Sequence, residues 1–327
     1  SSAEQSLKAS IYQVERVGAF SDDIRDGIRG NVFDAVDRGF VNGKDGMEES
    51  IKFSVVGAVP HPQVVLTKNE KGTKSWAGSP IQSINYASCH DNNTLWDRLQ
   101  ASRKDASKED LIKMNNLTAA IYMTSQGIPF IHAGEEFLRT KVAEDGEIIH
   151  NSYNSPDYVN KLRWSNLEDE KYADVYDYYK GLISLRSAHP AFRMSAQEDI
   201  QNNLTFMEDT PLGVVAFNLE NNANGDSASD IAVIHNATDS EQVISLPKSA
   251  DWQLVVNGET AGTDVIEVVS GDSVTVTPNS SYVLMIDDSM NATENFNQVL
   301  LIAGAALLVI AGTAGYIIYD KKQKASK

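Results

Sequence analysis

Residues 83–93 read SINYASCHDNN, and this stretch decides the fold. Ile84 and Tyr86 lie among small residues and predict a strand, whereas the side chains from His90 onward prefer loops. The pattern recurs at residues 128–133 (IPFIHA), where an apolar run predicts a buried strand that ends in Gly-Glu-Glu. Strands that end in polar clusters, with helices between them, indicate an α/β protein with parallel strands.

A helix should connect these two strands. Ser107 and Asp110 form a capping box ahead of an apolar face at helical spacing, and Gly127 should end the helix. A second helix should stop before Pro190. The alternation is typical of either a barrel or an open sheet, and in both of them ligands meet the C-terminal ends of the strands. Two weaker candidates are a strand at residues 17–22 and a helix at residues 48–59.

Between about residues 202 and 288, apolar residues no longer recur at helical spacing. Short β-rich runs such as DIAVIHN and SYVLMID alternate with Asn, Gly, Asp and Ser turns at regular spacing. This spacing predicts an antiparallel β-sandwich. We therefore expect an α/β part over residues 1–195 and a β-sandwich domain over residues 196–288.

The C-terminal residues predict a membrane anchor. Residues 299–319 contain no charged side chain, and four lysines follow within residues 320–327. A run of this length matches the bilayer core, and the lysines place the tail in the cytoplasm. Residues 289–298 would be a polar stalk. Because residues 1–20 lack the pattern of an export signal, we expect the chain to be the C-terminal piece of a longer protein.

Composition excludes several classes of function. The 327 residues carry 45 acidic and 28 basic side chains, for a net charge of −17. Nucleic acid is not expected as a partner, because phosphate binding needs clustered lysine and arginine. The single cysteine, Cys89, cannot form an internal disulfide, and the histidines show no metal-ligand spacing.

Three polar clusters follow expected strands: Ser21-Asp22-Asp23, His90-Asp91-Asn92-Asn93 and Gly134-Glu135-Glu136. Strand ends are where barrel enzymes hold catalytic side chains. From the residues alone, Asp91 and Glu135 form a candidate carboxylate pair of a glycosidase. A loop of good turn formers, or acidic residues in the first turn of a helix, explains the same residues without catalysis.

Several stretches of the sequence resemble a known family. The run YASCHDNNTLWDRL (86–99) is similar to the fourth conserved region of the α-amylase family, glycoside hydrolase family 13. Residues 20–34 (FSDDIRDGIRGNVFD), 130–141 (FIHAGEEFLRTK) and 151–164 (NSYNSPDYVNKLRW) resemble type I pullulanases in the same order. The resemblance implies the C-terminal part of a (β/α)8 TIM-type barrel, followed by the β-sandwich and one transmembrane helix.

The resemblance also assigns roles to residues. Asp91 matches the third carboxylate, which stabilises the transition state, while the nucleophile and the general acid of the family should lie upstream of Ser1. The Asp91 and Glu135 pair is therefore withdrawn. His90 and Asn92 match substrate-binding positions, and Asp157 and Lys161 match loop positions that contact further glucose units, with arginine more usual at the position of Lys161.

Two functions follow as hypotheses. The first is the C-terminal fragment of a retaining pullulanase that cleaves α-1,6 linkages in pullulan, starch or glycogen and is inactive alone. The alternative is a surface-anchored glucan-binding module without hydrolytic activity. Both imply an α-glucan partner and the extracellular face of a bacterial cell. No cofactor is evident, although the family resemblance makes calcium conceivable without identifiable ligands here. The oligomeric state is unknown.

Overall fold

A small parallel sheet organises the first half of the chain. The computed structural model describes residues 8–65 and 75–287. The sheet has the order β1-β2-β3, and both pairings are parallel, which confirms the predicted α/β arrangement. The strands are shorter than the apolar runs that predicted them: β1 is Ala19–Phe20, β2 is Ser83–Asn85 and β3 is Ile128–Pro129.

The longest helices follow the predicted caps and apolar faces. Ser107 Oγ accepts a hydrogen bond from the Asp110 backbone N–H at 3.1 Å and donates one to the Asp110 carboxylate at 2.7 Å. The α4 helix ends at Thr124, ahead of Gly127. The helices are α1 (Asp22–Arg29), α2 (Glu48–Val55), α3 (Leu95–Ser102), α4 (Lys108–Thr124), α5 (Asp157–Asn160), α6 (Glu170–Ala188) and α7 (Gln197–Asn203). Short 3₁₀ turns are η2 (Lys8–Gln13), η3 (Pro80–Gln82), η4 (Glu135–Phe137), η5 (Trp164–Glu168), η6 (Pro190–Arg193) and η7 (Ala223–Gly225).

The α2 helix is shorter than the predicted helix at residues 48–59. It ends at Val55 because the chain turns at Gly57, whose φ is +67°. A Cβ atom at Gly57 would lie 2.8 Å from the Cβ of Pro80, so only glycine fits the turn.

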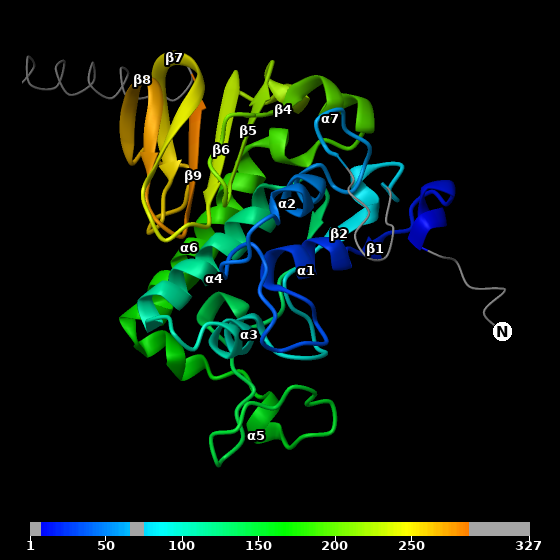
Figure 1. Cartoon of the computed structure of the whole chain (residues 1–327), viewed down its shortest axis with the longest axis vertical. Helices are drawn as coiled ribbons and strands as arrows, with labels where there is room; N and C mark the ends of the chain where they lie inside the picture. Colours follow the sequence, from blue (N-terminus) through cyan, green and yellow to red (C-terminus); the bar gives the residue numbers. More distant parts are fainter. Residues whose placement is uncertain (1–7, 66–74, 288–327) are drawn as a thin grey trace, which may run out of the picture. The chain divides into compact units, whose positions relative to one another are not determined.

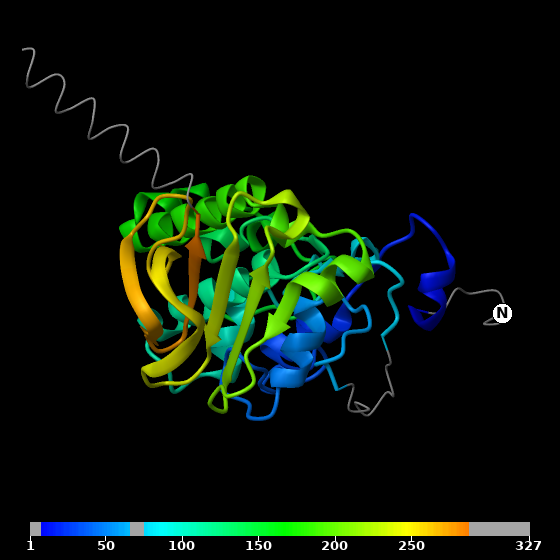
Figure 2. The ribbon, with the colours of Figure 1, turned by 90° about the horizontal axis from the view of Figure 1, so that it is seen from above.

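The second half of the chain forms one antiparallel sheet of six strands in the order β4-β5-β6-β9-β7-β8. The predicted antiparallel strands are confirmed, and their pairing is continuous, because β9 bonds to both β6 and β7. The sheet curves strongly, since Val214 on β5 and Val274 on β8 share one buried cluster with Trp252 (Figure 2). The strands are β4 (Leu204–Phe206), β5 (Val214–Glu220), β6 (Asp230–Asn236), β7 (Gln242–Val256), β8 (Glu267–Val276) and β9 (Ser280–Ile286).

Helix α4 packs against β6 and β9 of the antiparallel sheet and against α6, and Figure 1 shows α4 and α6 side by side. His235 on β6 is buried between the Ser281 hydroxyl at 2.7 Å and the Thr124 hydroxyl at the end of α4 at 3.4 Å. A Cβ atom at Gly181 would lie only 1.8 Å from the carbonyl oxygen of Ala261, so α6 approaches the turn after β7 directly. The α/β part and the antiparallel sheet therefore belong to one compact unit that ends at Ile286.

No helix within residues 8–65 and 75–287 is long and apolar enough to cross a membrane. The stalk, the span and the basic tail predicted for residues 289–327 lie outside the described residues.

Candidate functional site

The polar clusters predicted at the strand ends lie at one edge of the parallel sheet. Because β1, β2 and β3 are parallel, their carboxyl ends face the same side. Asp22, at the start of α1, accepts a hydrogen bond from the Tyr86 hydroxyl at 2.9 Å, so the first cluster contacts the segment that leads into the second. Arg25 also donates to Tyr86, at 2.7 Å, and holds the two segments together.

The loop His90-Asp91-Asn92 exposes two of its side chains at this edge. The His90 side chain is 86% exposed, the Asp91 side chain is 59% exposed, and His90 Nε2 lies 3.5 Å from Asp91 Oδ2. Asn92 has a φ of +61°, in the left-handed region. A carboxylate and an imidazole that face solvent on one loop can receive a hydroxyl-rich ligand from outside.

Buried polar groups on neighbouring segments hold the backbone of this loop. Lys141 is buried, and its Nζ donates to the carbonyl oxygens of His90 at 2.8 Å and Asn92 at 3.0 Å. Asp97 on α3 accepts hydrogen bonds from the Lys141 backbone N–H at 2.8 Å and from the Thr140 hydroxyl. Burial raises the pKa of Asp97, and these donors oppose the rise.

Glu135 belongs to a second buried network and not to the exposed edge. It is 4% exposed, and its carboxylate accepts hydrogen bonds from Ser88 at 2.7 Å, Tyr122 at 2.7 Å and Tyr179 at 3.2 Å. Burial raises the pKa of Glu135 to about 7, although the three hydroxyl donors lower it. Its neighbour Glu136 accepts from the Gly134 backbone N–H at 2.9 Å. Glu135 thus ties the strand ends to α4 and α6.

Asp157 and Lys161 lie at the two ends of α5. Both are exposed, and Lys161 Nζ lies 4.9 Å from the centre of the Tyr158 ring. Arg163 connects this segment to the base of the loop, because it donates to the carbonyl oxygens of Tyr158 at 2.9 Å and Thr140 at 3.1 Å. The two predicted substrate-binding segments are therefore joined through residues 140–141. Their roles in substrate binding stay predictions.

The sequence predicted none of the residues that support this loop. Asp97, Lys141 and Arg163 lie within the stretches that resemble pullulanases, but no pattern assigned them a role. One local signal was present, because Thr94-x-x-Asp97 matches a helix N-cap pattern, and the Thr94 hydroxyl accepts from the Asp97 backbone N–H at 3.1 Å. No such signal pointed to Lys141.

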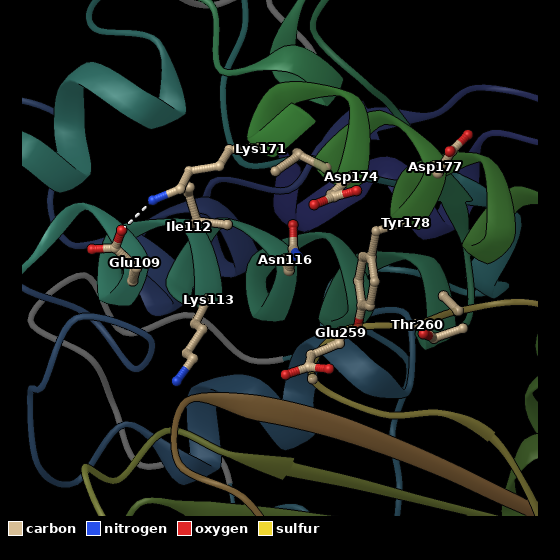
Figure 3. Close-up of a pocket in the computed structure, with 13 residues that line it drawn as sticks. Glu109, Ile112, Lys113, Asn116, Lys171, Asp174, Asp177, Tyr178, Glu259 and Thr260 are labelled. Atoms are coloured by element: carbon tan, nitrogen blue, oxygen red, sulfur yellow. Dashed lines mark hydrogen bonds and ion pairs between the residues drawn. The ribbon is translucent and has the colours of Figure 1, made fainter. Parts of the chain in front are cut away.

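A separate hollow of about 560 Å³ lies away from the exposed edge. Helices α4 and α6 and the turn after β7 line it, and Glu109 and Lys171 form an ion pair at one end (Figure 3). Its lining includes none of the five residues assigned to the candidate site. Within the described part of the chain, no group of three or more His, Cys, Asp or Glu side chains is placed to hold a metal ion.

Comparisons with known proteins agree with this architecture. A family model described as "Pullulanase, all-beta domain" matches residues 200–260. The pullulanase of Bacillus subtilis is 33% identical over 251 residues, which cover 77% of this chain and 32% of that protein. The chain thus spans about a third of the length of that relative.

Solved structures give the same result. The pullulanase from Bacillus acidopullulyticus is 39% identical, with a TM-score of 0.73 over 82% of this chain and 30% of that one. The apo pullulanase from Paenibacillus barengoltzii is 36% identical, with a TM-score of 0.75 over 86% of this chain and 40% of that one. The fold, the polar edge and these matches together define a homologue of the glycoside hydrolases. Within that class, the chain is a homologue of the type I pullulanases, as its motifs predicted.

Proposed function

We propose that the chain is the C-terminal part of a pullulanase-type enzyme that hydrolyses α-1,6 linkages in pullulan, starch or glycogen. The observation that carries this proposal is the exposed Asp91 at the carboxyl end of the central parallel strand, on a loop fixed from below by Lys141. A fixed geometry of the charged group is what transition-state stabilisation requires.

In this proposal Asp91 binds sugar hydroxyls and strengthens its contacts as the ring flattens toward an oxocarbenium ion. His90 donates a hydrogen bond to the same glucose unit, and Asn92 is a further residue of the pocket. Asp157 and Lys161 contact glucose units further along the chain. The nucleophile and the general acid would come from upstream segments, so this chain alone would be inactive.

The free edges of the parallel sheet support assignment to part of a barrel. Phe20 on β1 is 41% exposed and Ile128 on β3 is 46% exposed, although both belong to strands of a type that is normally covered on both faces. A closed barrel would pair both outer strands with further parallel strands.

Hydrolysis of pullulan, with amylose as the control substrate, tests the proposal. We expect the product of the upstream-extended coding region to release maltotriose and this chain to release nothing. Asp91→Asn in the extended protein should lower kcat by at least about a hundredfold. The matched variant Asp209→Asn, at an exposed aspartate before β5, should keep full activity.

The opposite results contradict parts of the proposal. Release of maltotriose by this chain would place a nucleophile and an acid within it. If maltotriose binds but neither protein hydrolyses pullulan, the surface-anchored glucan-binding module is favoured instead.

We also propose that the protein is held on the extracellular face of a bacterial cell by residues 299–319. The support is the uncharged run of 21 residues followed by lysines. Deletion of residues 299–327 should release the protein from the membrane fraction into the medium. Retention of the truncated protein in the membrane fraction would contradict the anchor.

A further inference from the structure

Lys141 is a buried residue whose ammonium donates hydrogen bonds to one loop. It lies after β3, and its ammonium donates to two backbone carbonyl oxygens, those of His90 and Asn92. The carboxylates whose charges act on the ammonium are those of Asp97 and Asp91. Burying an ammonium is costly, so its partners must compensate for the lost water. The two carbonyl groups of the Asp91 loop provide that compensation.

The backbone of Lys141 is fixed independently of its side chain. Asp97 on α3 accepts from the Lys141 backbone N–H and from the Thr140 hydroxyl. Because α3 begins at Leu95, three residues after Asn92, the contacts form a closed ring from the loop through α3 and Asp97 to Lys141 and back to the loop. The ammonium is therefore presented to the loop from a fixed base.

The loop conformation needs such a hold. Asn92 has a φ of +61°, which is unfavourable for a residue with a side chain, although asparagine tolerates it better than most. The carbonyl groups of His90 and Asn92 turn inward to Lys141, while the side chains of His90 and Asp91 stay exposed. Burial and the charge of Arg139 lower the pKa of Lys141, and smaller opposing contributions, first from Asp97 and last from Asp91, raise it.

We propose that Lys141 is a positioning residue that holds the Asp91 loop in the conformation that binds glucan. The expected effect on glucan binding rests on the proposed function. The expected effect on the conformation of the loop does not depend on any ligand. The ammonium fixes the two carbonyl groups on either side of Asp91, so its removal frees the backbone that carries the carboxylate.

The first measurement is backbone order by ¹⁵N relaxation in the full chain. In Lys141→Met the order parameters of residues 90–93 should fall from about 0.85 to below about 0.6, while those of β6 stay unchanged. Lys141→Arg should preserve most of the order, because its guanidinium also donates several hydrogen bonds. Lys113→Met, which removes an exposed lysine on α4, is the matched control and should change neither region.

The second measurement is maltotriose affinity of the same proteins by calorimetry. Lys141→Met should weaken binding by about tenfold or more, Lys141→Arg should largely restore it, and Lys113→Met should bind like the wild type. If Lys141→Met loses its cooperative unfolding transition, Lys141→Gln replaces it with the same expectations, because the shorter amide cannot span both carbonyl groups.

The two measurements separate the inference from the proposed function. Unchanged order in residues 90–93, or unchanged affinity despite a mobile loop, would overturn the positioning role. The loop could become mobile in Lys141→Met while the wild type does not bind maltotriose. That result would support the role of Lys141 in fixing the loop and would contradict Asp91 as a glucan contact.

Discussion

The buried carboxylate of Glu135 should make the stability of this protein fall as the pH rises. The variant Glu135→Gln keeps the shape of the side chain and removes its titration. Burial raises the pKa of Glu135 from 4.5 to about 7, against three hydroxyl donors. The folded protein therefore holds a proton on Glu135 that the unfolded chain has already released, and that contribution is fully present below about pH 4.5 and lost as the pH rises through about 7.

The size of the effect follows from the same two values. At about 1.36 kcal/mol for each pKa unit, the difference between 4.5 and about 7 corresponds to roughly 3 kcal/mol. Relative to Glu135→Gln, the wild type should lose about that much free energy of unfolding between about pH 5 and pH 8. Other titrating groups cancel in this comparison because both proteins contain them.

Urea-induced unfolding of both proteins across this pH range measures the difference. Leu212→Ala is the control, since it replaces an exposed side chain that carries no titrating group, and its curve should run parallel to that of the wild type. Parallel curves for the wild type and Glu135→Gln would refute the reasoning, because they would mean that the hydroxyl donors keep Glu135 ionised throughout.

Three further predictions concern other buried groups. Trp252→Ala should lower the free energy of unfolding by about 3–5 kcal/mol in urea, because the indole is fully buried in the curved sheet, whereas Leu212→Ala at an exposed position should change it by less than about 0.5 kcal/mol. Asp226→Ala should cost about 3 kcal/mol at neutral pH, since it leaves the buried His189 and two backbone N–H groups without their acceptor; an unchanged urea midpoint would contradict this. Burial, Arg139 and Lys141 lower the pKa of His132 to about 4, so its ring NMR signals should titrate near that value, and a midpoint near 6.5 would show that the ring is solvated.

Local patterns in the sequence predicted the elements that depend on neighbouring residues. The predictions of the capping box at Ser107 and of the strand at Ile84 were correct, because helix caps and apolar periodicity depend only on residues close together in the sequence. The polar clusters were placed at one edge because parallel strands leave no other arrangement. The family resemblance then assigned a role to Asp91 that no spacing within this chain revealed.

The lengths of elements and the pairing of the β-rich half were less predictable. Alternation along a strand reports which face is buried but not which strand is the neighbour, so one continuous sheet and two separate sheets give the same pattern. The turn at Gly57 shortened α2 through its close approach to Pro80, which follows it by 23 residues in the sequence.

The sequence by itself determined that this chain has parallel strands with polar ends, an all-β second half and the motifs of a pullulanase homologue. Only the tertiary structure decided what holds the candidate site. Lys141 reaches His90 across 51 residues, and Glu135 reaches Ser88 across 47. Local preferences cannot encode such contacts, because a buried charge finds its partners only when distant segments pack around it.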